Sequence, residues 1–134
     1  ADHSAWQTTQ RLELDAVLAT SDVISIHLPL TPETRGLIGT DAFAQMKSDA
    51  VLVNAARGGV MDEAALVAAL KDGKLGGAAI DVFEEEPLRK GGKLFERVPN
   101  LILTPHIAGN TVESNGRVSG LVAERVMAAL EGRA

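Results

Sequence analysis

The sequence has 134 residues, of which 46% are hydrophobic and 23% charged, and these values fit one globular domain. Its net charge of −5 argues against nucleic acid as a partner, and the absence of cysteine excludes disulfides and thiolate chemistry. No apolar run approaches the roughly 18 residues of a membrane span, and no basic-then-apolar leader opens the chain. We therefore expect a cytoplasmic protein that binds neither nucleic acid nor membranes.

Short apolar runs alternate with helical patterns along the chain. The runs are rich in valine, isoleucine and leucine and are apolar on both faces, which is typical of buried parallel strands. They cover residues 23–28, 50–55, 77–83 and 101–105. This pattern predicts an α/β fold in which right-handed crossovers build a parallel sheet flanked by helices.

Four helices are predicted around these strands. The first covers residues 12–20, and the second is the DAFAQMK segment, with Thr40 or Asp41 as its cap. Asp62 is the expected N-cap of the third, and Gly73 stands where that helix should end. A long last helix covers 112–130, with apolar residues at helical spacing. These residues are Val118, Leu121, Val122, Val126 and Leu130.

Two loops rich in proline, glycine and charge leave the C-terminal ends of predicted strands, at residues 29–39 and 84–100. That edge of an open α/β sheet is where ligands bind. Arg57, Glu86 and His106 each follow a different strand there. Singly, each is ordinary: a solvated charge, an acidic loop or a structural histidine. Their convergence at one edge favours an active site.

The three side chains also suit one another chemically. An arginine offers a fixed fork of donors that holds a carboxylate and faces a neighbouring carbonyl. A histidine exchanges a proton near neutral pH, and an adjacent carboxylate fixes its tautomer and favours the imidazolium. This set suits proton transfer at the oxygen of a small 2-oxo or 2-hydroxy acid. Hydride transfer would require a cofactor, because no side chain supplies it.

Four segments, in order, carry a family resemblance: SDVISIHLPLTPETRGLIG, VNAARGGVMDEAALVAAL, GAAIDVFEEEP and LTPHIAG. The chain resembles the D-isomer-specific 2-hydroxyacid dehydrogenases, which include phosphoglycerate, glycerate, formate and D-lactate dehydrogenases, from about Leu12 to Gly132. The resemblance implies a Rossmann-type fold, NAD or NADP as cofactor, and a homodimer.

The resemblance also implies roles for individual residues. Arg57 would bind and polarise the substrate, His106 would be the acid/base, and Glu86 would be its partner. Asp81 would hold the nicotinamide carboxamide, although a helix-facing or capping aspartate is an alternative. Residues expected to line the cofactor are Leu28, Pro29, Ala55, Ala56, Arg57, His106, Ile107, Ala108 and Gly109.

Two further expectations concern residues near this site. Gly58 and Gly59 would let the chain turn tightly beside substrate and nicotinamide without side-chain bulk. His27, which lies inside a predicted strand, is expected to be a buried structural histidine rather than a catalytic one.

The sequence also departs from the family. It contains no G-x-G-x-x-G segment, which in the family grips the pyrophosphate, and no separate substrate domain. Residues 1–134 are therefore expected to form a partial NAD(P)-binding domain, its second half plus the long closing helix, that alone is weak or inactive. The substrate and the choice between NAD and NADP are left open, because the selecting residues are not in this sequence.

Two alternatives compete with the dehydrogenase interpretation. Glu84, Glu85 and Glu86 could hold a metal for hydrolysis together with His106, although adjacent carboxylates lack ligand spacing. The chain could instead be a non-catalytic module that acts through dimerisation or assembly, with apolar patches exposed where neighbours are missing.

Overall fold

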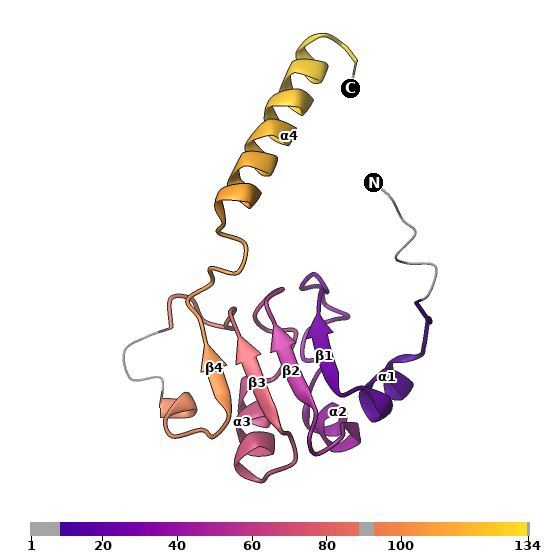
Figure 1. The fold of residues 1–134 in the computed structure, drawn as a ribbon, viewed down its shortest axis with the longest axis vertical. Helices are drawn as coiled ribbons and strands as arrows, with labels where there is room; N and C mark the ends of the chain where they lie inside the picture. Colours follow the sequence, from indigo (N-terminus) through magenta and orange to yellow (C-terminus); the bar gives the residue numbers. More distant parts are fainter. Residues whose placement is uncertain (1–8, 89–92, 134) are drawn as a thin grey trace.

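The computed structural model describes residues 9–88 and 93–133. Its centre is a four-stranded parallel sheet in the order β1-β2-β3-β4 (Figure 1). The strands are β1 (Val23–Ile26), β2 (Val51–Asn54), β3 (Gly77–Ile80) and β4 (Leu101–Leu103). This arrangement confirms the predicted α/β fold with a parallel sheet.

The helices are α1 (Leu14–Thr20), α2 (Thr40–Gln45), α3 (Glu63–Lys71) and α4 (Val112–Leu130), with a short 3-10 helix, η2 (Lys93–Phe95). All four predicted helices are therefore present. Residues 89–92 of the second predicted loop lie outside the described residues.

The helix caps follow the sequence in part. The Asp62 side chain accepts a hydrogen bond from the backbone N–H of Ala65 at 2.9 Å, as predicted for the N-cap of α3. Gly73 follows the C-cap of that helix with φ of +67°, a conformation that suits glycine. The predicted cap of α2 is wrong, because Thr40 is already helical and Gly39 is the N-cap.

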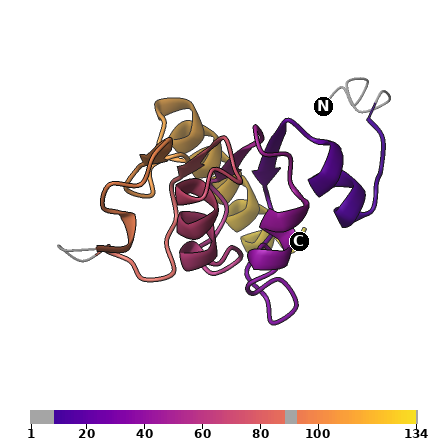
Figure 2. The same cartoon turned by 90° about the horizontal axis from the view of Figure 1, so that it is seen from below.

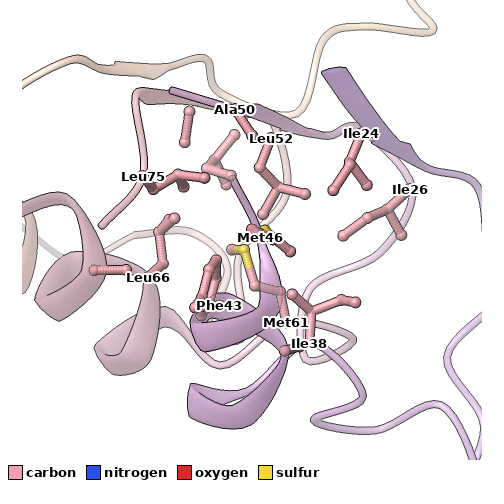
Figure 3. Packing of buried hydrophobic residues seen from close by; sticks show 14 of the residues in the cluster. Ile24, Ile26, Ile38, Phe43, Met46, Ala50, Leu52, Met61, Leu66 and Leu75 are labelled. Atoms are coloured by element: carbon pink, nitrogen blue, oxygen red, sulfur yellow. The ribbon is translucent and has the colours of Figure 1, made fainter. Parts of the chain in front are cut away.

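The core lies between the sheet and the helices α2 and α3 (Figure 2). Leu52 of β2 and Leu66 of α3 are fully buried, and Figure 3 shows strand side chains pointing toward Phe43 and Leu66. Successive side chains alternate across a strand, so β1, β2 and β3 place alternate residues in this core, and Leu101 of β4 packs against it. The buried cluster therefore fixes the sheet's register and holds its C-terminal edge in place.

The other face of the sheet differs from the prediction of strands buried on both sides. Val23 and Ile102 are 64% and 65% exposed, because the described helices that pack on the sheet lie on its opposite face. Helix α4 extends beyond the C-terminal edge of the sheet (Figure 1), and its apolar side chains are also exposed. In the described part of the chain, no helix is both long and apolar enough to cross a membrane.

Candidate active site

The predicted site residues lie at one edge of the sheet. All four strands run in parallel, so their C-terminal ends meet at the upper edge in Figure 1. Arg57 follows β2, Asp81 and Glu86 follow β3, and His106 follows β4. Because these three strands are neighbours, the segments that carry the site residues leave the sheet side by side.

Glu86 and His106 form a hydrogen-bonded pair. The Glu86 Oε2 atom lies 2.7 Å from Nδ1 of His106, and Oε1 accepts a hydrogen bond from the backbone N–H of Phe83 at 2.8 Å. The bond to His106, followed by the one from Phe83, holds the pKa of Glu86 below its usual value. An ionised carboxylate only accepts hydrogen bonds, so Nδ1 carries a proton.

The second ring nitrogen of His106 is open to a ligand. Among the residues that the structure describes, none hydrogen-bonds to Nε2, and half of the side chain is exposed. Glu86 therefore fixes the imidazole ring through Nδ1, and Nε2 stays accessible to a ligand. A pocket of about 560 Å³ opens beside the pair. It is lined by Phe83, Glu86, Pro87, Leu88, Leu103, Thr104, Pro105 and His106.

Asp81 anchors the loop that carries His106. Its side chain is buried, and Oδ1 accepts hydrogen bonds from the Thr104 hydroxyl and from Ile107 N–H. Oδ2 accepts a third from Ala108 N–H at 2.8 Å. Burial opposes ionisation of Asp81, but these hydrogen bonds outweigh it and lower its pKa. Residues on both sides of His106 are thus tied to the end of the neighbouring strand.

Arg57 is exposed at the end of a turn that Asn54 holds in place. The buried Asn54 side chain accepts a hydrogen bond from Ala56 N–H at 3.1 Å and donates one to the Arg57 carbonyl at 3.2 Å. The Arg57 guanidinium itself donates to the Ala56 carbonyl at 2.6 Å. Asn54 therefore fixes the backbone on both sides of this turn, while the guanidinium stays at the surface.

The two glycines after Arg57 have separate structural reasons. A Cβ atom on Gly58 would lie 1.8 Å from the carbonyl oxygen of Phe83, so only glycine fits. Gly59 has φ of +78°, which side chains disfavour. The turn after β2 therefore packs directly on the loop that leads to Glu86.

The remaining predicted cofactor residues lie along the same edge. Leu28 and Pro29 follow β1 and are exposed, as is Ala55, whereas Ala56 is half-buried. The backbone from Ile107 to Gly109 follows His106 and is also exposed. The structure brings these segments to one edge, where they can line a ligand.

The expectation that His27 is buried is wrong. His27 is exposed just beyond the end of β1, and its Nε2 lies 2.8 Å from the hydroxyl oxygen of Ser25. Ile24 and Ile26 are the buried positions of β1, so Ser25 and His27 lie on the opposite, exposed face of the strand. As for the metal alternative, no group of three or more metal-ligating side chains is found among the described residues.

Sequence reasoning did not assign roles to Asn54, Thr104 and Glu63. Asn54 is the polar last residue of an otherwise apolar strand, and a buried amide there signals a side chain that holds a turn. Thr104 precedes the Pro-His pair, but its bond to Asp81 spans 23 positions, so no local pattern indicates it. Glu63 binds the backbone of Glu84 across 21 positions.

Comparison with known proteins identifies a family for this chain. A family described as "D-isomer specific 2-hydroxyacid dehydrogenase, NAD binding domain" matches residues 2–108. The chain belongs to this family. The match covers every predicted site residue except Gly109.

Individual relatives cover almost the whole chain. An (S)-sulfolactate dehydrogenase from Chromohalobacter salexigens is 51% identical over 100% of this chain and 43% of its own length. A glyoxylate reductase from Thermofilum pendens is 48% identical over 90% of the chain and 35% of its own length. The chain thus spans less than half the length of these curated relatives.

Solved structures show the same fold. A D-lactate dehydrogenase from Sporolactobacillus sp. aligns with a TM-score of 0.84 at 32% identity, over 97% of this chain and 43% of that one. An NAD-complexed D-isomer specific 2-hydroxyacid dehydrogenase from Lactobacillus delbrueckii aligns with a TM-score of 0.81 at 30% identity, over 92% and 41%. The chain therefore has the Rossmann-type half-domain fold of NAD-dependent relatives.

Proposed function

We propose that this chain is the catalytic part of an NAD-dependent dehydrogenase that interconverts a D-2-hydroxy acid and its 2-oxo acid. The observation that carries the proposal is the His106–Glu86 pair, at 2.7 Å, on a loop anchored by buried Asp81. Family membership supports the same reaction class.

His106 is proposed to move the proton. Its Nδ1–H is engaged by Glu86, so Nε2 is the atom that gives a proton to the carbonyl oxygen in reduction and takes it from the hydroxyl in oxidation. The carboxylate of Glu86 stabilises the imidazolium that exists before the proton is delivered. Replacing His106 by alanine in the full-length enzyme should lower turnover by about 10²–10⁴-fold. Unchanged turnover would contradict the assignment.

Arg57 is proposed to bind the substrate's carboxylate and to polarise the adjacent carbonyl. Its guanidinium is exposed at the same sheet edge, and its planar fork matches a carboxylate. The carbonyl oxygen gains negative charge as reduction proceeds, and a fixed cation nearby stabilises it. Asn54 contributes by holding the turn from which Arg57 extends.

The residues present fit a nicotinamide cofactor. Asp81 has about four acceptor positions, as any carboxylate has, and three are used by the protein, so Oδ2 can accept one more hydrogen bond, from a carboxamide. When bound, NAD supplies or accepts the hydride. Leu28, Pro29, Ala55 and Ala56, with the segment from Ile107 to Gly109, would line it. NADP remains an alternative.

We further propose that residues 1–134 act as a partial domain. The sequence has no G-x-G-x-x-G segment. All of the chain aligns with the (S)-sulfolactate dehydrogenase, but it spans only 43% of that protein's length. Without pyrophosphate contacts the isolated chain should bind NADH weakly and turn over poorly. A spectrophotometric assay of NADH oxidation tests this directly. Robust turnover by the 134-residue chain would contradict it.

The substrate is proposed to be a small 2-oxo acid. Relatives are named for sulfolactate, glycerate, glyoxylate and phosphoglycerate, which share a carboxylate next to a carbonyl or hydroxyl carbon. Reduction rates of sulfopyruvate, hydroxypyruvate, glyoxylate and phosphohydroxypyruvate, measured with the full-length enzyme, would rank these candidate substrates. Failure to reduce any 2-oxo acid would contradict the proposed reaction.

The alternative is a non-catalytic module that acts through assembly, and helix α4 favours it. Val118, Leu121, Val122 and Val126 of this helix are each at least half exposed. A homodimer in the cytoplasm is compatible with both functions, since exposed apolar faces suit association and the sequence has no cysteine. Light scattering over a range of concentrations tests assembly, and cofactor binding measured by calorimetry separates the two functions.

A further inference from the structure

Glu63 makes a contact that reaches outside its own helix. It is the first residue of α3, and its Oε1 accepts a hydrogen bond from the backbone N–H of Glu84 at 2.6 Å. The N-terminus of α3 is already capped by Asp62. Glu63 therefore joins the start of α3 to the loop after β3.

The loop that Glu63 contacts carries the partner of His106. Glu84 lies two residues before Glu86, and the neighbouring Phe83 N–H donates to Glu86 itself. Consecutive backbone N–H groups of this loop thus bind the two glutamates. On its other side, the Phe83 carbonyl packs against Gly58. The loop is held from both sides, and Glu63 provides the polar contact on the α3 side.

The electrostatic surroundings of Glu63 disfavour its negative charge. Burial is the main cause that raises its pKa, and the nearby acids Glu84, Asp62 and Glu86 raise it further. The hydrogen bond from Glu84 N–H acts in the opposite direction. Arg35 pairs with the Glu84 side chain at 3.8 Å on the exposed surface. Glu63 is thus a partly buried acid surrounded by acids, and it accepts a hydrogen bond from the backbone N–H of Glu84.

We propose that Glu63 is a positioning residue, which fixes the backbone at Glu84 and thereby sets where Glu86 meets His106. The inference rests on the proposed function, because it gives the Glu86–His106 pair a role in proton transfer. Glu63 does not itself touch the reacting atoms. It acts through the loop from residues 83 to 86.

The pKa of Glu86 provides the test, since the bond to His106 is the main cause that lowers it. Carbon-detected NMR would follow the Glu86 carboxyl resonance from acid to neutral pH in the 134-residue chain. An E86Q spectrum would identify that resonance. The Glu63→Ala substitution has two possible effects on the pKa of Glu86, and they have opposite signs. Loss of positioning weakens the bond to His106 and raises the pKa of Glu86, whereas loss of a nearby negative charge lowers it.

Three further variants complete the experiment. Glu63→Gln keeps an oxygen that accepts from Glu84 N–H, so the pKa of Glu86 should stay low. Glu63→Asp keeps the charge but is one methylene shorter, so it should raise that pKa as alanine does, and it decides the question if Glu63→Ala does not fold. Asp62→Ala removes the helix cap beside Glu63 and is the matched control, which should leave the Glu86 titration unchanged.

An unchanged or lowered pKa of Glu86 in both Glu63→Ala and Glu63→Asp would overturn the inference, as would an equal rise in Asp62→Ala. In the full-length enzyme, Glu63→Ala should lower kcat by up to about 10²-fold, the range expected for a misplaced catalytic group, with little change in KM. Turnover that does not depend on His106 would refute the proposed function instead, whatever the titration shows.

Discussion

Gly58 lies against the carbonyl group of Phe83, so closely that a Cβ atom on Gly58 would be 1.8 Å from the Phe83 oxygen. The contact joins the turn that carries Arg57 to the loop that leads to Glu86. Backbone meets backbone here, so neither partner can move aside as a flexible side chain would. The relative position of the segments that carry Arg57 and Glu86 depends on this contact.

Gly58→Ala should therefore destabilise the chain. The added methyl group must displace the loop after β3, and overpacking of this kind typically costs about 1–3 kcal/mol. Urea unfolding followed by circular dichroism would measure the loss. Gly120→Ala is the control, because a Cβ there meets nothing within 4 Å and alanine favours the helix. Equal stabilities of the two variants would contradict the close contact.

Asp81→Asn should also destabilise the chain, by about 1–3 kcal/mol at neutral pH, the cost of leaving buried donors unsatisfied. Asparagine keeps one acceptor oxygen but places an NH₂ group opposite a donor, either the Ala108 N–H or the pair from Thr104 and Ile107. Urea unfolding of both proteins at several pH values would measure the difference.

The pH dependence of that difference has a definite sign. The pKa of Asp81 is lower in the folded state than its ordinary value of 3.8, so ionised Asp81 stabilises the fold above that pH. This contribution should be lost as the pH falls through the lower, folded-state pKa. The two proteins should then converge in stability under acid conditions. A gap that stays constant at low pH would show that the carboxylate charge is not involved.

Glu86→Gln should change the pH profile of reduction in the full-length enzyme. In the proposed mechanism His106 delivers the proton for reduction, and a neutral amide stabilises an imidazolium less than a carboxylate does. The fall in kcat with rising pH should therefore occur at lower pH in the variant. Steady-state kinetics across the neutral range would show the displacement. An unmoved profile would separate Glu86 from the proton-transfer step.

Arg57→Lys should impair the full-length enzyme although the positive charge is kept. A lysine ammonium is a point charge and cannot form the two parallel hydrogen bonds that a guanidinium makes with a carboxylate. The loss should appear in kcat/KM for the 2-oxo acid, while NADH binding changes little. Arg125→Lys on exposed α4 is a control for the substitution type. Wild-type kinetics would remove Arg57 from the site.

The fold could be predicted from the sequence to a large extent, because strand and helix patterns are local. All four strands are nevertheless shorter than the predicted runs at 23–28, 50–55, 77–83 and 101–105. The last residues of these runs are apolar or aromatic, which suggests a longer strand, but β3 ends at Ile80, and the Asp81 side chain binds the loop after β4. The exposed face of the sheet could not be predicted either, since the runs are apolar on both sides.

The candidate site could be predicted as residue types at strand ends, but its internal bonds could not. The bond between Glu86 and His106 was implied by family resemblance, and the structure gives its geometry. The contacts of Asp81 and Glu63 link residues more than 20 positions apart through particular backbone N–H groups. Such contacts depend on how neighbouring loops fold together, so no local pattern encodes them.

Asp81 holds His106 in place independently of β4, the strand that His106 follows. β4 has three residues and, in the described part of the chain, pairs along one side only, so transient fraying of this edge is expected. The tether at Ile107 and Ala108 starts from β3, which is paired on both sides. Amide hydrogens of Ile107 and Ala108 should consequently exchange with deuterium more slowly than those at the rim of β4, and His106 would keep its place while that rim opens and closes.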